Sequence, residues 1–172
     1  MADLYIGLMS GTSLDGVDAV LARFPGSAAI EVIGHLHQPF EPVLREELLA
    51  LNSPGDNEAH RCALAANGMA RAYAQLVHAL LRQSGRGPAD VRALGAHGQT
   101  IRHRPGEFDG NGYTLQLLNG ALLAELSGID VVCDLRGRDV AAGGQGAPLV
   151  PAFHRALFAR PDADIAVLNI GG

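Results

Sequence analysis

The loop at residues 10–16, Ser-Gly-Thr-Ser-Leu-Asp-Gly, carries residue types that bind phosphate and lies between two apolar segments. Gly11 and Gly16 let the backbone approach a ligand closely, the hydroxyl side chains between them can donate hydrogen bonds, and Asp15 can hold a metal ion directly or through water. Successive backbone N–H groups in such a turn can form an anion-binding nest. The spacing supports an ordinary hairpin turn equally well, although the loop is longer than a two-residue hairpin requires.

A second loop, Gly-Ala-His-Gly-Gln-Thr at residues 95–100, ends a predicted strand. Ligands in α/β proteins often bind beyond the carboxyl ends of strands. His97 and Gln99 are therefore candidates for hydrogen bonds to a sugar hydroxyl. From the residues alone, a histidine that caps a turn is the favoured interpretation of His97.

A third loop places two Arg and two Asp within residues 134–139, which is too polar for a strand interior. Arg136 and Arg138 can bind a carboxylate or phosphate in a bidentate manner. Solvated salt bridges of little energetic value are the alternative. The adjoining glycine-rich stretch at 143–146 favours a ligand site.

Composition limits which chemistry is available. The chain has 172 residues, 48% of them hydrophobic, with a net charge of −5, which predicts a folded core and argues against a general nucleic-acid partner. All 13 basic residues are Arg. The absence of Lys excludes a Lys-dependent P-loop and Schiff-base catalysis. Any phosphate must therefore be held by backbone amides, hydroxyls, Arg or a metal.

Neither cysteine usage nor hydropathy indicates an extracytoplasmic protein. Cys62 and Cys133 have no metal-site spacing and are predicted to be buried structural thiols. The first residues lack a basic segment with a cleavage site. No apolar run approaches the ~20 residues that a membrane span needs. The sequence therefore predicts a cytoplasmic protein without a membrane partner.

The hydrophobic periodicity predicts an α/β fold. A long helix at 57–83 carries one apolar stripe, and three strands joined by short turns predict an antiparallel meander. The stripe consists of Met69, Tyr73, Leu76, Val77, Leu80 and Leu81. Strands are predicted at 4–9, 17–24, 30–37, 91–96, 113–118, 129–135 and 165–170, and the other helices at 41–51, 120–126 and 148–158. Because the last strand runs into Gly171-Gly172, we expect the chain to be part of a longer protein.

Four segments, in order along the chain, carry a resemblance to a known family. They are Gly-Leu-Met-Ser-Gly-Thr-Ser-Leu-Asp-Gly-Val-Asp at 7–18, His-Gly-Gln-Thr at 97–100, Gly-Gly-Gln-Gly-Ala-Pro-Leu-Val-Pro-Ala-Phe-His at 143–154, and Leu-Asn-Ile-Gly-Gly at 168–172. Together they resemble the anhydro-N-acetylmuramic acid kinases. The first and third segments are long enough to be specific.

The resemblance implies an actin-like ATPase or sugar-kinase fold, ribonuclease H-like, with ATP in a cleft between two α/β domains. Residues 1–160 would form the first domain with a connecting helix, and 161–172 the first strand of the second. Mg²⁺ would accompany ATP near Asp15, and the full-length protein would be a homodimer. The implied ATP-binding residues are Gly11, Thr12, Ser13, Leu14, Asp15, Gly16, Val17 and Asp18.

The implied reaction is hydrolytic opening of 1,6-anhydro-N-acetylmuramic acid with phosphate transfer from ATP to O6, giving N-acetylmuramic acid 6-phosphate and ADP. It serves peptidoglycan recycling and amino-sugar catabolism. The family's general-base Asp follows a segment that ends here at Gly172, so we expect no catalytic residue and no turnover in these 172 residues. A non-catalytic nucleotide-binding remnant is the alternative. Gly137 stands where the family usually has a third Arg, which weakens the prediction that Arg136 and Arg138 grip substrate.

Overall fold

The computed structural model describes residues 4–25 and 30–168. They form two compact units. The first contains the described residues up to His103 together with Leu115–Leu135, and the second contains Arg104–Thr114 and the described residues from Arg136 onward. The turn expected at 25–27 and the motif at 168–172 lie largely outside the described residues. The domain boundary at residue 160, which concerns the longer protein, stays a prediction.

The N-terminal part of the first unit is the predicted meander. Strands β1 (Leu4–Met9), β2 (Gly16–Arg23) and β3 (Glu31–Pro39) are consecutive and antiparallel. Apolar side chains alternate along β1, so that Leu4, Ile6 and Leu8 are buried on one face. The short apolar segments separated by turn residues were sufficient to predict all three strands.

Two parallel strands complete the sheet. β4 (Val91–Ala96) pairs parallel with β1, and β7 (Val131–Val132) pairs parallel with β4. The strand order is β3-β2-β1-β4-β7. This mixed sheet with its helices confirms the α/β class, and its order and directions fit the actin-like, ribonuclease H-like domain that the sequence predicted.

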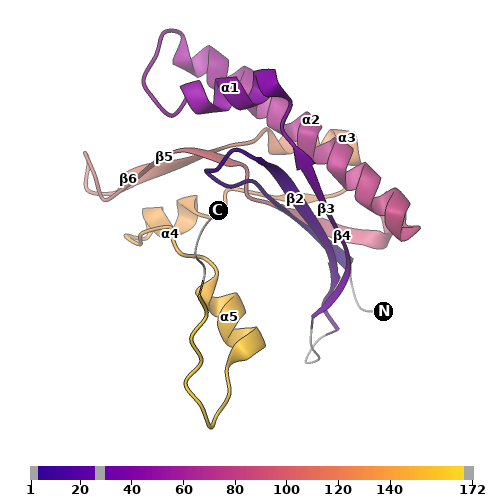
Figure 1. Cartoon of the computed structure of the whole chain (residues 1–172). Helices are drawn as coiled ribbons and strands as arrows, with labels where there is room; N and C mark the ends of the chain where they lie inside the picture. Colours follow the sequence, from indigo (N-terminus) through magenta and orange to yellow (C-terminus); the bar gives the residue numbers. More distant parts are fainter. Residues whose placement is uncertain (1–3, 26–29, 169–172) are drawn as a thin grey trace. The chain divides into compact units, whose positions relative to one another are not determined.

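Helices α1 (Pro42–Ala50), α2 (Glu58–Ser84) and α3 (Gly120–Ser127) lie on the same side of this sheet (Figure 1). The apolar stripe of α2 is buried along its whole length, as predicted, and packs into the core formed by β1, β2 and β4. Gly85 ends α2 in the left-handed conformation that favours glycine. A short 3₁₀ helix, Pro88–Asp90, leads into β4.

The predicted loop after His97 is instead a strand. β5 (Gln99–Pro105) and β6 (Gly112–Leu117) form a separate two-stranded sheet. β6 was predicted, but β5 was missed because its segment, Gln-Thr-Ile-Arg-His-Arg-Pro, contains a single strongly apolar residue. That residue, Ile101, is buried.

Three other predictions were wrong in whole or in part. The fifth strand of the sheet covers only Val131–Val132, because the backbone turns at Asp134 with a positive φ. Residues 165–168 form no strand, and 169–170 lie outside the described residues. Both cysteines are free thiols, but they are not fully buried as predicted: Cys133 is exposed and Cys62 is half-buried. Burial raises the pKa of the Cys62 thiol.

The second unit contains two helices. α4 (Gly137–Ala141) forms where a loop was predicted, since five residues are too few to show a helical period. α5 (Pro151–Phe158) begins later than expected: Pro151, not Pro148, opens it. Among the described residues, no helix is both long and apolar enough to cross a membrane.

Truncation of the α2 stripe should destabilise the fold strongly. Leu80 is fully buried, whereas Leu64 on the same helix is 56% exposed. We expect Leu80→Ala to lower the free energy of unfolding by about 2–5 kcal/mol, because it leaves a cavity in the core. The matched Leu64→Ala variant should change it by less than about 1 kcal/mol. Urea unfolding of both variants measures the difference, and equal effects would contradict the packing of α2.

Candidate functional site

The loop that joins β1 to β2 is held in a defined conformation. The Leu14 N–H donates to the Gly11 carbonyl at 3.2 Å, which closes a turn. Leu14 has φ 55, unusual for a branched side chain, and that side chain is buried in the core. Such a backbone costs about 1–3 kcal/mol and persists only where the surroundings enforce it. The burial of Leu14 is one such enforcement.

Two side chains from elsewhere in the first unit bind the loop's carbonyl groups. Gln99 Nε2 donates to the Gly11 carbonyl at 3.1 Å, and Arg45 Nε donates to the Leu14 carbonyl at 2.9 Å. Gln99 belongs to β5 and Arg45 to α1. Both carbonyl oxygens are therefore directed towards protein donors.

The neighbouring amides are left available. In a trans peptide the C=O of one residue and the N–H of the next point in opposite directions. The Thr12 N–H is therefore directed away from Gln99. Within residues 4–25 and 30–168, the amides of Thr12 and Ser13 donate to no protein acceptor. Consecutive exposed amides of this kind can bind an anion.

Asp15 is an ionised, exposed carboxylate at the end of this turn. The Ser13 hydroxyl donates to Asp15 Oδ1 at 2.8 Å, and the Gly16 N–H donates to the same oxygen at 3.1 Å. The Ser13 hydrogen bond and these backbone contacts lower the pKa of Asp15. Both of these donors bind Oδ1, and Oδ2 accepts no hydrogen bond from another described residue. Asp15 thus has an oxygen available for a cation or its water shell.

The rest of the predicted nucleotide segment is strand. Gly16 begins β2, and Val17 is buried in the core, so its side chain serves packing. Asp18 is half-exposed on β2, with its Oδ1 3.0 Å from His35 Nε2 and 3.3 Å from His37 Nδ1 on β3. Asp18 therefore has protein partners of its own, unlike the amides of the turn.

Ser10, which follows β1, contacts both helix α2 and the turn between β4 and β5. Its hydroxyl donates to the Gly98 carbonyl at 3.1 Å and lies 3.1 Å from Tyr73 Oη, so the Tyr73 hydroxyl is the donor in that pair. Burial raises the pKa of Tyr73 to about 12. The sequence pattern identifies Tyr73 only as part of the α2 stripe. A tyrosine among buried aliphatic residues is a usable signal, because its hydroxyl needs a partner.

The two side chains predicted from the His-Gly-Gln-Thr segment are both buried. His97 Nδ1 lies 2.7 Å from the Gly98 carbonyl and donates to it, because a carbonyl can only accept. This contact corresponds to the turn-capping interpretation. Gln99 is 1% exposed and supports the loop, and its Oε1 is buried without a hydrogen-bond partner among the described residues. Sugar binding by either residue stays a prediction.

Gly98 itself must be glycine. It has φ 76, and a Cβ added there would lie 2.9 Å from the Leu117 carbonyl oxygen. The turn between β4 and β5 therefore passes close against the end of β6. This close approach fixes the position from which the Gln99 side chain reaches the loop.

Arg136 and Arg138 belong to the second unit. Arg136 Nη1 donates to the Gly146 carbonyl at 2.6 Å, and burial lowers the pKa of Arg136. The Asp139 carboxylate accepts from the Gly146 N–H at 2.7 Å. Both contacts hold the glycine-rich stretch at 143–146 against residues 136–139. Arg138 is exposed, and binding of substrate by either arginine stays a prediction.

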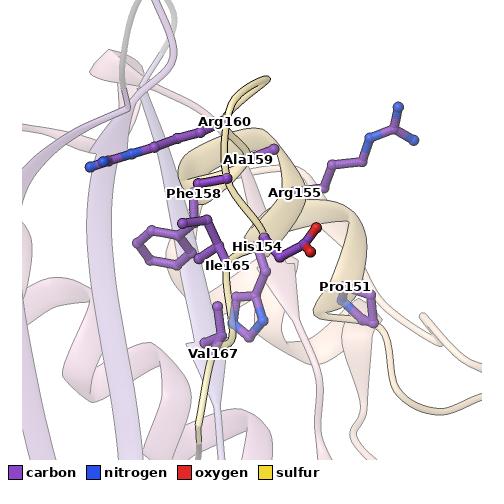
Figure 2. A pocket seen from close by; sticks show the side chains of 10 residues that line it. Pro151, His154, Arg155, Phe158, Ala159, Arg160, Ile165 and Val167 are labelled. Carbon is purple, nitrogen blue, oxygen red and sulfur yellow. The ribbon is translucent and has the colours of Figure 1, made fainter.

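A cavity of about 440 Å³ lies within the second unit, between α5 and residues 159–167. His154 and Phe158 project from α5 towards Ile165 and Val167 (Figure 2). A mainly apolar groove of about 430 Å³ in the first unit lies beside α1 and α2. Of the predicted site residues, only Val17 lines either space.

Comparison with known proteins agrees with the resemblance read from the motifs. Residues 3–172 match the sequence model of a family described as anhydro-N-acetylmuramic acid kinase. The chain belongs to this family. A relative of that name from Variovorax paradoxus (strain S110) is 66% identical over 170 residues, which is 99% of this chain and 45% of the relative. The kinase of that name from Albidiferax ferrireducens is 63% identical over 172 residues, which is 100% of this chain and 44% of the relative.

A third family member, the anhydro-N-acetylmuramic acid kinase of Ralstonia nicotianae, is 60% identical over 172 residues, 100% of this chain and 45% of the relative. The chain thus spans less than half the length of these curated relatives. The family match includes the turn, its two supporting side chains and the glycine-rich stretch, because it runs through residues 3–172.

The two glycines of the turn should respond differently to alanine. A Cβ at Gly16 would lie 2.3 Å from the Gln38 carbonyl oxygen of β3, whereas a Cβ at Gly11 would make only an ordinary contact with Ser13. We expect Gly16→Ala to destabilise the fold by about 1–3 kcal/mol through overpacking and Gly11→Ala by less than about 1 kcal/mol. Urea unfolding distinguishes them, and a larger cost at Gly11 would contradict the described turn.

Tyr73 should make stability fall at high pH. Because its folded-state pKa is about 12 and its ordinary value is 10, the neutral phenol is favoured in the folded state. This contribution is present below pH ~10 and is lost as the pH rises to ~12, a loss of about 2–3 kcal/mol. The free energy of unfolding of Tyr73→Phe should lack this decline. Parallel pH profiles for the two proteins would refute the assignment.

Proposed function

We propose that the protein containing this chain is an ATP-dependent kinase that opens 1,6-anhydro-N-acetylmuramic acid with water and phosphorylates O6. The products are N-acetylmuramic acid 6-phosphate and ADP. The observation that carries the proposal is the family match over residues 3–172, which includes the turn at 10–16. Peptidoglycan recycling and amino-sugar catabolism are the corresponding roles. ATP as donor places the reaction in the cytoplasm.

The conformation of the turn supports phosphate binding. The exposed amides of Thr12 and Ser13 are donors without protein acceptors among the described residues, and no Lys is available in the chain to replace them. Backbone donors suit a phosphate because they neutralise charge without a flexible side chain. In this proposal residues Gly11–Asp18 contribute to the ATP site, with Val17 acting through packing.

Asp15 is the candidate for interaction with Mg²⁺. The described residues hold no cluster of three or more His, Cys, Asp or Glu able to bind a metal alone. Mg²⁺ would therefore arrive with ATP, with phosphate oxygens and water as most of its ligands. The ionised Asp15, whose Oδ2 accepts no hydrogen bond from another described residue, fits a ligand or a partner for that water shell. The ion would neutralise charge on the phosphates.

Substrate binding and assembly complete the proposal. His97, Gln99, Arg136 and Arg138 are proposed for the substrate side because they fall in the family's motif segments or beside them. The general base that activates water is proposed to follow residue 172. A homodimer is proposed for the full-length protein.

The reaction is tested with the full-length protein, ATP–Mg²⁺ and 1,6-anhydro-N-acetylmuramic acid. In H₂¹⁸O, we expect one ¹⁸O at the anomeric carbon of the phosphosugar and none in its phosphate, because water opens the ring while ATP supplies the phosphoryl group. Mass spectrometry of the product measures both. No ADP and no phosphosugar, or ADP with labelled inorganic phosphate alone, would overturn the proposal.

The same assay tests the turn. Gly11→Val and Asp15→Ala should lower kcat/KM for ATP at least tenfold, through a blocked approach and a lost carboxylate respectively. The control Leu64→Ala, on an exposed face of α2, should retain full activity. Unchanged kinetics in both turn variants would place nucleotide binding elsewhere.

A further inference from the structure

Gln99 is buried in a way that lowers the stability of the folded state, because one of its two amide atoms has no hydrogen-bond partner among the described residues. Its Nε2 has two carbonyl neighbours, Gly11 at 3.1 Å and Thr100 at 3.4 Å, so the orientation of the amide is settled. Its Oε1 then faces no donor among the described residues. A buried acceptor without a partner destabilises the folded state. An apolar residue of similar size would avoid that cost.

The bond that Gln99 makes to the loop does not close the turn. The Gly11 carbonyl already accepts the Leu14 N–H, and the Leu14 side chain is anchored in the core. What the Gln99 amide adds is a second donor on one particular carbonyl. That donor fixes the plane of the Gly11–Thr12 peptide and hence the direction of the Thr12 N–H.

Arg45 acts in the same way at the other end of the turn. Its Nε binds the Leu14 carbonyl, which fixes the plane of the Leu14–Asp15 peptide. Its terminal guanidinium nitrogens donate to no acceptor among the described residues, and the side chain is exposed. A positive charge therefore lies next to the turn in a chain that has no Lys. Arg45 belongs to none of the motifs in the sequence, so its role becomes visible only in the fold.

We propose that Gln99 and Arg45 are positioning residues for phosphate binding by the turn. They hold the Gly11 and Leu14 carbonyls towards the protein, so that the amides of Thr12 and Ser13 face the ligand before it arrives. Donors that are already oriented bind charge without the free-energy cost of reorganising the loop. This inference rests on the proposed function, because it takes the phosphates of ATP as the ligand.

The test separates the phosphates from the rest of the nucleotide. Calorimetry with the full-length protein measures the Kd of the Mg²⁺ complex of the β,γ-imido analogue of ATP and the Kd of adenosine. Gln99→Leu should raise the Kd of the analogue about threefold to tenfold, the scale of one lost hydrogen bond, and leave that of adenosine unchanged. Its midpoint of urea unfolding should stay equal or rise, because the buried Oε1 is removed as well.

Gln116→Leu is the matched control. Gln116 lies on β6, and its Nε2 donates to the Thr100 hydroxyl at 3.2 Å. The same change of chemistry there should leave both Kd values unaltered. Arg45→Gln should raise the Kd of the analogue threefold or more. Arg45→Lys should recover part of that loss in affinity, because it restores the charge but not the planar Nε donor.

The outcomes are distinct. If the wild-type protein does not bind the analogue, the proposed function fails. If the wild-type protein binds the analogue, and the Kd values of Gln99→Leu and Arg45→Gln both stay within twofold of the wild-type Kd, the inference is overturned while the function stands. Equal losses for the analogue and adenosine would mean a general structural role and would also overturn it. Should Gln99→Leu not fold, Arg45→Gln decides alone, since Arg45 is exposed.

Discussion

The parallel pairing of β1 with β4 determines where the candidate site lies. β1 is central in the sheet, antiparallel to β2 on one side and parallel to β4 on the other. Because parallel strands end at the same edge of a sheet, the loop after β1 and the turn after β4 become neighbours. The bonds from Ser10 to Gly98 and from Gln99 to Gly11 follow from that proximity.

Stability and ligand binding place opposing demands on this edge of the sheet. The left-handed backbone of Leu14 and the buried, unsatisfied Oε1 of Gln99 both cost free energy in the folded state. The core beneath compensates for them, through the buried stripe of α2 and the Leu14 side chain. A rigid scaffold with an unsatisfied surface turn is what binding of an anion by backbone amides requires.

Regular periodicity explains why much of the fold could be predicted. The three-stranded meander and α2 repeat apolar residues often enough to identify an element from sequence. No such repeat is present in β5, where Ile101 is the one strongly apolar residue, or in α4, which has only five residues. The exposure of Cys133 could not be predicted from the sequence either, because it depends on β7 ending after two residues at the edge of the sheet.

By itself, the sequence determined the chemistry available to the site: a glycine- and hydroxyl-rich turn with one acidic residue, no Lys, and motifs of a kinase family. Only the tertiary structure decided which groups support the turn. Gln99 is 88 residues from Gly11, Tyr73 is 63 from Ser10, and Arg45 is 31 from Leu14. Local propensity contains no information on such pairs, because sheet pairing and helix packing bring them together. The direction of the loop's amides follows from those distant contacts.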